Sequence, residues 1–103
     1  MNDKPDTARS KNLTGPVMQA GELADAVVEA AAIDNPGKKI LVDDHIAYLR
    51  IQADGELILR RATVSECLGR AFEMRELEVN LSGFSGQIEY GTDQVRFYLE
   101  KKL

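Results

Sequence analysis

The sequence predicts an α+β domain with antiparallel-rich mixed sheets and helices packed on one side. Three observations support this fold class: one apolar stripe with helical spacing, several short segments of alternating polarity, and the order of the elements. That order is strand, helix, three strands, helical segment and two strands, which suggests two strand–helix–strand–strand-like halves. With 44% apolar and 29% charged residues, a chain of 103 residues can bury one core unaided.

The beginning of the chain separates into a polar segment and the start of a domain. Residues 1–12 contain almost no apolar side chains, so we expect a flexible tail there and one domain over residues 13–103. Val17 and Met18 then predict a brief strand. Pro16 suits an edge strand or a strand's first residue, because proline cannot donate a ladder hydrogen bond.

The clearest helix of the sequence follows this strand. Its apolar residues recur at the helical period, at Ala20, Leu23, Ala24, Val27, Val28 and Ala31. The run Asp34-Asn35-Pro36-Gly37 ends this helix, because Pro36 disfavours helical backbone at Asn35.

The middle of the chain predicts three strands. Residues 39–42 form the first, and Asp43-Asp44 predicts a turn after it. Residues 46–52 alternate and form the second strand. Asp54-Gly55 predicts a hairpin turn because both residues tolerate positive φ, and residues 56–61 form the returning strand.

Two short helices are expected next. Thr63-Val64-Ser65-Glu66 matches a capping box, and the helix that it starts ends at Gly69. Residues 73–78 predict a further helical segment that becomes extended near Val79, although alternation around Val79 also fits a strand.

The last part of the chain combines a glycine-rich segment with a hairpin. Gly83-Phe84-Ser85-Gly86 predicts a loop or a β-bulge. Residues 87–90 and 94–99 predict two strands that pair across the turn at Gly91-Thr92-Asp93.

Charge and cysteine content limit the classes of function. Thirteen basic and seventeen acidic residues give a net charge of −4, which argues against duplex nucleic-acid binding and against a polybasic membrane anchor. No apolar run approaches the length of a membrane span. The single Cys67 cannot form an internal disulfide, and the first residues lack the apolar segment of a secretory signal, so we expect a cytoplasmic protein.

No residue pattern indicates catalysis or a cofactor. Asp43-Asp44-His45 is better explained as a solvated turn than as a metal site, because neighbouring side chains on a turn diverge. Cys67 is better explained as a buried small apolar residue than as a nucleophile. Residues 83–86 match the Gly-x-x-Gly loop of RNA-binding KH domains, but no basic residue flanks them. These patterns favour a cofactor-free, metal-free binding or regulatory protein.

A longer pattern resembles a known family. The best-matched segment runs from Glu76 to Ile88, and the resemblance covers residues 15–101. Other matching segments are Gly15-Pro16-Val17, Ala20-Gly21-Glu22-Leu23, Ile33-Asp34-Asn35-Pro36-Gly37-Lys38, Gly55-Glu56-Leu57-Ile58-Leu59 and Asp93-Gln94-Val95-Arg96-Phe97-Tyr98. In these segments the chain resembles the effector (coupling) proteins of multicomponent bacterial diiron monooxygenases, which include the regulatory components of methane monooxygenase and phenol hydroxylase. The toluene monooxygenase branch is the most similar.

The resemblance implies a non-catalytic regulatory component without cofactor or metal. Such a protein binds the large subunit of the diiron hydroxylase component and modulates its conformation, turnover, coupling and regiospecificity. Electrons come from an NADH-dependent reductase, through a ferredoxin in toluene systems, and the substrates are aromatic hydrocarbons. Size makes a monomer the expected free state. A generic α+β interaction module remains an alternative, and a small carboxylate enzyme is a weaker one.

Two segments are expected to contact the partner. The first comprises Asn80, Ser82, Gly83, Phe84, Ser85, Gly86 and Gln87, because glycines let a partner's backbone approach closely. A purely structural bulge explains these glycines equally well. Asp34 and Asn35 form the second segment, for which a helix stop is the alternative. If Gly86 contacts the partner, a bulky replacement there weakens hydroxylase binding while the fold survives.

Overall fold

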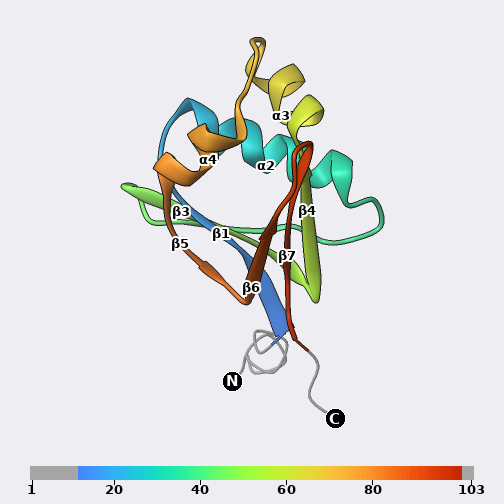
Figure 1. Cartoon of the computed structure of the whole chain (residues 1–103). Helices are drawn as coiled ribbons and strands as arrows, with labels where there is room; N and C mark the ends of the chain where they lie inside the picture. The colour runs from blue at the N-terminus through green and yellow to red at the C-terminus, as the bar shows by residue number, and fades with distance from the viewer. Residues whose placement is uncertain (1–11, 101–103) are drawn as a thin grey trace.

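Over residues 12–100, the part of the chain that it describes, the computed structural model has three helices and two antiparallel sheets (Figure 1). The elements are β1 (Leu13–Gln19), α2 (Glu22–Asp34), β2 (Leu41–Asp44), β3 (Tyr48–Asp54), β4 (Glu56–Arg60), α3 (Arg61–Leu68), α4 (Met74–Asn80), β5 (Leu81–Ser85), β6 (Gln87–Tyr90) and β7 (Gln94–Tyr98). One sheet has the order β2-β3-β1-β5 and the other has the order β4-β7-β6. The α+β prediction is confirmed, with every strand pair antiparallel. The predicted tail lies outside the described residues, except for Asn12.

The first half of the chain has the predicted strand–helix–strand–strand order, and its three strands share a sheet. The prediction for Pro16 is wrong, because β1 lies inside the sheet, between β3 and β5. The ladder to β3 nevertheless skips the position of Pro16: Thr14 pairs with Ala53, and the next pair joins Val17 to Arg50. This gap accommodates a residue that has no N–H to donate.

Two predicted turns are corrected by the structure. Asp43 and Asp44 are the last residues of β2, and the turn follows them. Asp54-Gly55 is not a hairpin turn, because β3 and β4 belong to different sheets. With a φ of 80°, Gly55 forms the corner between the sheets, and its N–H donates to the Asn12 carbonyl at 2.8 Å. A turn signal in the sequence marks where one strand ends and the next begins, but it does not determine which strands pair with each other.

The second half of the chain does not repeat the first, since it has two helices before its last three strands, and β5 joins the first sheet. The predicted capping box is wrong: α3 begins at Arg61, and the Thr63 hydroxyl donates to Asp34 instead, at 2.7 Å. The end of α3 is confirmed, with Gly69 at a φ of 77°. A capping-box bond occurs in α4, where the Glu76 carboxylate accepts from the N–H of Glu73 at 3.1 Å.

The glycine-rich segment is a strand rather than a loop, and it ends at the corner formed by Gly86. A bulge is present, because β1 pairs Val17 with Gly83 and then Met18 with Leu81. The terminal hairpin of β6 and β7 is confirmed.

The core fills the space between the sheets and α2, and the helices gather on one side of the strands (Figure 1). α2 packs against β4 and α3. The predicted apolar stripe is largely confirmed, although Ala20 is exposed before the helix and Val28 is only partly buried. The largest fully buried side chains include Phe97, Met18, Ile51, Leu57 and Leu59. Full burial of such a side chain contributes about 1.5–3 kcal/mol.

Candidate partner-binding surface

The segment Asn80–Gln87 runs from the end of α4 along β5 to the first residue of β6. β5 is the end strand of its sheet, with β1 as its neighbour. At the bulge, Ser82 is the extra residue on β5, and it is exposed. An end strand has backbone groups without a neighbouring strand, so it can pair with another chain.

Phe84 gives this edge an apolar side chain that lies partly at the surface. The residue is 44% exposed, while its ring also approaches Phe97 with the ring centroids 6.3 Å apart. Gln87, just beyond the corner, is exposed as well. The segment therefore combines a strand edge, an aromatic ring and polar side chains within reach of a partner.

The two glycines of the segment have different surroundings. Gly86 has a φ of 91°, and a Cβ atom there would lie 2.5 Å from the Thr14 Oγ1 and 2.6 Å from the Tyr98 carbonyl oxygen. Gly83 has an ordinary φ, and a Cβ atom there would meet nothing within 4 Å. The fold requires a glycine at position 86 but not at position 83. The expectation that a bulky residue at Gly86 leaves the fold intact is therefore corrected.

Ser85 is bonded to strands β1 and β3, and Asn80 is bonded within α4. The carbonyl of Ser85 accepts from the buried Thr14 hydroxyl at 2.6 Å, and its own hydroxyl accepts from the Gln52 amide at 2.9 Å. The Asn80 amide donates to the Glu76 carbonyl at 2.9 Å, near the end of α4. Sequence reasoning missed Thr14 and Gln52, because they lie 71 and 33 positions from Ser85 and no local pattern marks such contacts.

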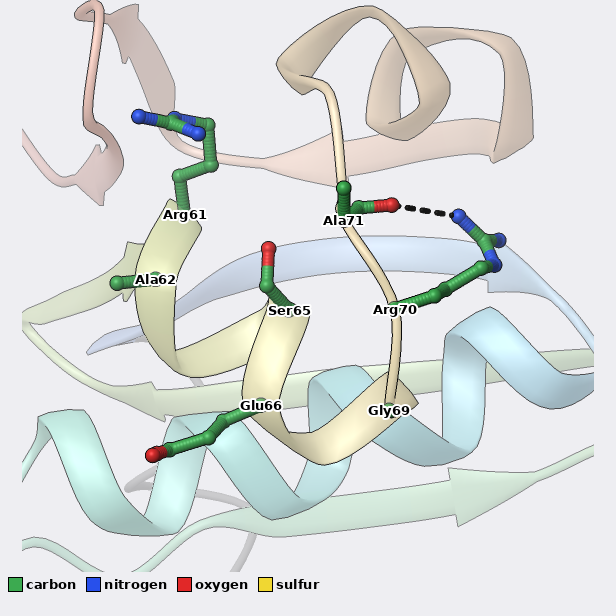
Figure 2. Close-up of a pocket in the computed structure, with 7 residues that line it drawn as sticks. All are labelled: Arg61, Ala62, Ser65, Glu66, Gly69, Arg70 and Ala71. Carbon is green, nitrogen blue, oxygen red and sulfur yellow. Dashed lines mark hydrogen bonds between the residues drawn. The ribbon is translucent and has the colours of Figure 1, made fainter.

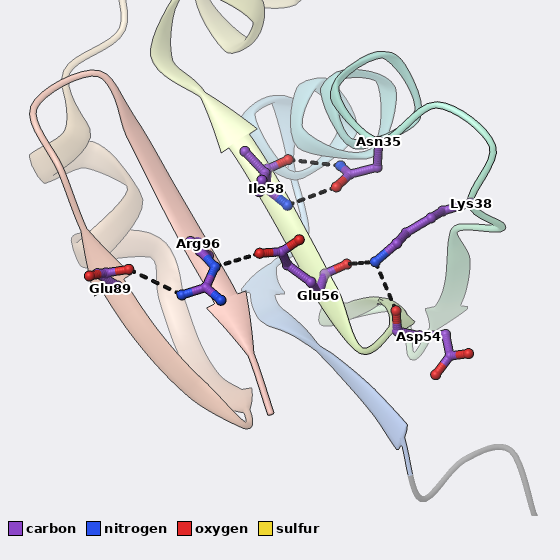
Figure 3. A network of polar contacts seen from close by, with 7 residues as sticks. All are labelled: Asn35, Lys38, Asp54, Glu56, Ile58, Glu89 and Arg96. Carbon is purple, nitrogen blue, oxygen red and sulfur yellow. Dashed lines mark hydrogen bonds and ion pairs between the residues drawn. The ribbon is translucent and has the colours of Figure 1, made fainter. Parts of the chain in front are cut away.

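Asn35 lies elsewhere, against the outer edge of β4 (Figure 3). Its side-chain oxygen accepts from the Ile58 N–H at 2.9 Å, and its amide donates to the Ile58 carbonyl at 2.8 Å. The same amide donates to the Ala31 carbonyl at 2.8 Å, and the residue is only 7% exposed. The Asn35 side chain thus pairs with β4 as one residue of a neighbouring strand would.

Two neighbours of Asn35 extend this contact along the same edge. Asp34 accepts from the Arg60 N–H at 2.8 Å, and Lys38 donates to the Glu56 carbonyl at 2.7 Å. We call Asp34, Asn35 and Lys38 the β4 edge cap. The contacts of Asp34 and Asn35 are contacts within the fold, and the structure does not bring these residues together with β5. The alternative role, ending the helix, is present too, since the Asn35 N–H donates to the Ala31 carbonyl.

A shallow hollow beside α3 contains two arginines, Arg61 and Arg70, and both are already paired with carboxylates (Figure 2). Arg61 pairs with Asp93 at 3.1 Å, and Arg70 pairs with Glu76 at 3.1 Å. The hydrogen bond from Arg70, helped by the backbone of Glu73, holds the pKa of the Glu76 carboxyl below its usual range. Both arginines already have carboxylate partners, so the hollow offers no free cation to an anionic ligand.

Cys67 and His45 are the two titratable residues that the sequence analysis weighed as candidates for chemistry. Burial, and next the charge of Glu29, raise the pKa of the half-buried Cys67 thiol, which disfavours the reactive thiolate. His45 contacts Asp43 at 2.9 Å and stacks on Tyr48. Within residues 12–100, no three side chains of the metal-binding types converge, and none of the helices there has the length and apolarity to cross a membrane.

The sequence of the chain is similar to those of two known proteins of similar length. The chain is 41% identical over 88 residues to the alkene monooxygenase system effector subunit of Xanthobacter autotrophicus (strain ATCC BAA-1158 / Py2), covering 85% of this chain and 87% of the relative. It is 40% identical over 84 residues to the phenol 2-monooxygenase stimulatory component DmpM of Pseudomonas sp. (strain CF600), covering 82% and 89%.

Solved structures share the fold. A chain in a structure of the phenol hydroxylase–regulatory protein complex matches with a TM-score of 0.73 and 27% identity, covering 85% of this chain and 99% of that one. The soluble methane monooxygenase regulatory protein B matches with a TM-score of 0.64 and 19% identity, covering 86% and 66%. The sequence model of the MmoB/DmpM family matches residues 12–98. The chain therefore belongs to the MmoB/DmpM family.

Proposed function

We propose that the chain is the cofactor-free effector of a multicomponent monooxygenase and that it binds the diiron hydroxylase component. The observation that carries this proposal is the identity of 40% and 41% to an effector subunit and a stimulatory component, over more than four fifths of each chain. The protein itself is not an enzyme in this proposal. It acts by changing the conformation of its partner.

The edge of β5 is the surface proposed to contact the hydroxylase. It carries Phe84, 44% exposed, and Gly83, whose missing side chain serves no need of the fold. Glycine in a strand weakens the strand and often marks a place where another backbone approaches closely. Ser82 and Gln87 add exposed polar groups on either side. We therefore place the contact along residues 80–87, with Ser85 and Gly86 as the residues that fix its shape.

The effect on the hydroxylase follows from linkage. An effector shifts a conformational equilibrium only by the difference in its affinity for the two states. A coupling of about 1–3 kcal/mol changes that equilibrium about 5- to 150-fold. Turnover, coupling of NADH use to product formation, and regiospecificity can all change in this way without any catalytic group on the effector.

The proposal also covers the substrates, the source of electrons and the state of the free protein. The substrates are aromatic hydrocarbons of the toluene type, and electrons reach the hydroxylase from an NADH-dependent reductase through a ferredoxin. The free protein is monomeric and cytoplasmic. The resemblance of the segments around Glu76–Ile88 supports the substrate class, and the single cysteine supports a reducing compartment.

A reconstituted assay tests the proposal. Hydroxylases of the toluene, phenol and alkene monooxygenase types are each combined with their own electron-transfer components and NADH, and this protein is titrated in. We expect a saturable rise in product formed per NADH consumed, largest with the toluene-type hydroxylase. A largest rise with another type would correct the substrate class alone. A flat response with all three, from folded protein, would favour the generic interaction module.

A further inference from the structure

The turn between β2 and β3 displays one apolar side chain on a strained backbone. Ile46 is 89% exposed, the highest value among the exposed large apolar residues of the described chain. The Ala47 N–H donates to the His45 carbonyl at 2.7 Å, so Ile46 is the central residue of a γ-turn. Its φ of 71° belongs to the rare, strained form of that turn, and it is unusual for a β-branched residue.

The surrounding contacts hold this turn rigid. The Ile46 N–H donates to the Asp44 carboxylate at 2.8 Å, and the His45 N–H donates to the Tyr48 carbonyl at 2.9 Å. The His45 ring stacks on Tyr48 with centroids 4.7 Å apart. The Ala47 carbonyl accepts from Ala20 at 2.9 Å, which fastens the turn to the end of β1. A side chain presented so rigidly loses little freedom when it binds.

Folding does not account for isoleucine at this position. Glycine adopts a positive φ freely, and asparagine does so more readily than other residues. Ile46 contributes no core packing in return, since nearly all of it is exposed. Strained residues of this kind concentrate at functional sites, where the surrounding structure holds them in place and the strain is part of the function.

The turn lies at the same end of the sheet as the start of β5. Met18 in β1 pairs with Leu49 on one side and with Leu81 on the other. The β2–β3 turn and the α4–β5 junction therefore flank the same end of β1, as Figure 1 shows. Exposed carboxylates of Asp43 and Asp44 border Ile46. The turn is thus continuous with the proposed hydroxylase contact, and it is both apolar and negatively charged.

We propose that Ile46 inserts into an apolar hollow on the hydroxylase component, with basic side chains of the hydroxylase facing Asp43 and Asp44. This inference rests on the proposed function and extends the contact from β5 to the opposite side of β1. The rigid turn sets the position of the side chain before binding. A single well-packed apolar contact of this kind can contribute a large share of an interface's affinity.

The test compares stability and affinity in the same variant. Ile46→Gly removes the side chain and suits the positive φ, so we expect it to melt at or above the temperature of the wild type. We expect its dissociation constant for the hydroxylase that the wild type stimulates to rise at least about tenfold. Ile33→Ala is the control, because Ile33 is 59% exposed on α2, away from the turn, and should bind as the wild type does.

Three outcomes separate the hypotheses. Wild-type affinity of Ile46→Gly would overturn the Ile46 contact and leave the proposed function intact. A melting temperature clearly below the wild type would overturn the strain argument, and Ile46→Asn, which also suits a positive φ, would repeat that check. If the wild type binds none of the three hydroxylases, the proposed function fails first and the Ile46 contact fails with it.

Discussion

The outer edges of β4 and β5 are both ends of sheets, and the molecule treats them in opposite ways. The edge of β4 is covered by Asp34, Asn35 and Lys38, whose side chains bond the backbone of Glu56, Ile58 and Arg60. Among the strands of residues 12–100, β5 pairs with β1 alone; its backbone also accepts from the Thr14 hydroxyl of β1 at Ser85 and donates from Leu81 to the Glu78 carbonyl of α4. A covered edge is closed to other chains, whereas an uncovered edge is available for a partner.

This difference separates two segments that the same resemblance singled out. Both contain small polar residues and glycine, which are common at turns and at binding sites alike. The contacts distinguish them: the Asn35 amide is fully used inside the fold, while Gly83 faces open space. The lesson is that a matched segment can belong to the scaffold or to the interface, and only its surroundings decide which.

The largest expected effect comes from replacing Gly86, and Gly83 in the same segment provides the comparison. Gly86→Ala combines a left-handed φ with close approach to Thr14 and Tyr98, so we expect it to destabilise the protein by about 3–5 kcal/mol. Gly83→Ala is the matched control and should change stability by less than about 1 kcal/mol. Urea denaturation followed by circular dichroism measures both. Equal losses of stability would show that the fold needs both glycines. They would also remove the reason for placing a partner contact at Gly83.

A smaller loss of stability is expected at the β4 edge cap. Asn35→Ala leaves the N–H and carbonyl of Ile58 without their partner, which should cost about 2–3 kcal/mol. The folded variant should still bind the hydroxylase with wild-type affinity, because the cap lies outside the proposed contact. A folded Asn35→Ala protein with weakened binding would place the interface at β4 instead of β5.

The smallest expected effect concerns the helix that leads into β5. Arg70 lowers the pKa of Glu76 from its usual value near 4.5, so the folded state favours the ionised carboxylate. The unfolded state therefore binds the proton more readily, and the stability from this pair is lost as the pH falls through the folded pKa. The Tm difference between the wild type and Glu76→Gln should be present at pH 7 and should shrink below about pH 4.5. A constant difference from pH 7 to pH 3 would contradict this role.

The sequence predicted local structure better than it predicted partners in space. The apolar stripe identified α2, and Gly69 identified the end of α3, because both signals depend on neighbouring residues. Asp54-Gly55 correctly marked the break between two strands, with Gly55 at a positive φ, but wrongly predicted a hairpin, since strand pairing is decided by packing over the whole domain. Thr63 was assigned to a cap and instead bonds Asp34, 29 positions away.

In the candidate site, too, the sequence indicated local features but not contacts between distant residues. The sequence identified residues 80–87 as a distinct segment, but it could not tell Gly83 from Gly86, because the atoms that crowd Gly86 come from distant parts of the chain, in β1 and β7. Ile46 carried no signal at all, since an isoleucine in an alternating segment predicts a strand rather than a strained turn. Exposure and φ reveal its conformation only once the fold is known.

Hydrogen–deuterium exchange of the protein with and without the hydroxylase distinguishes a partner contact along β5 from one at the β4 edge cap. The measurement compares peptides from β5 and the Gly86 corner with peptides from the β4 edge cap. We predict slower exchange on binding in residues 81–87, with little change in residues 34–38 and 56–60. Protection confined to residues 34–38 and 56–60, with none in β5, would contradict the account.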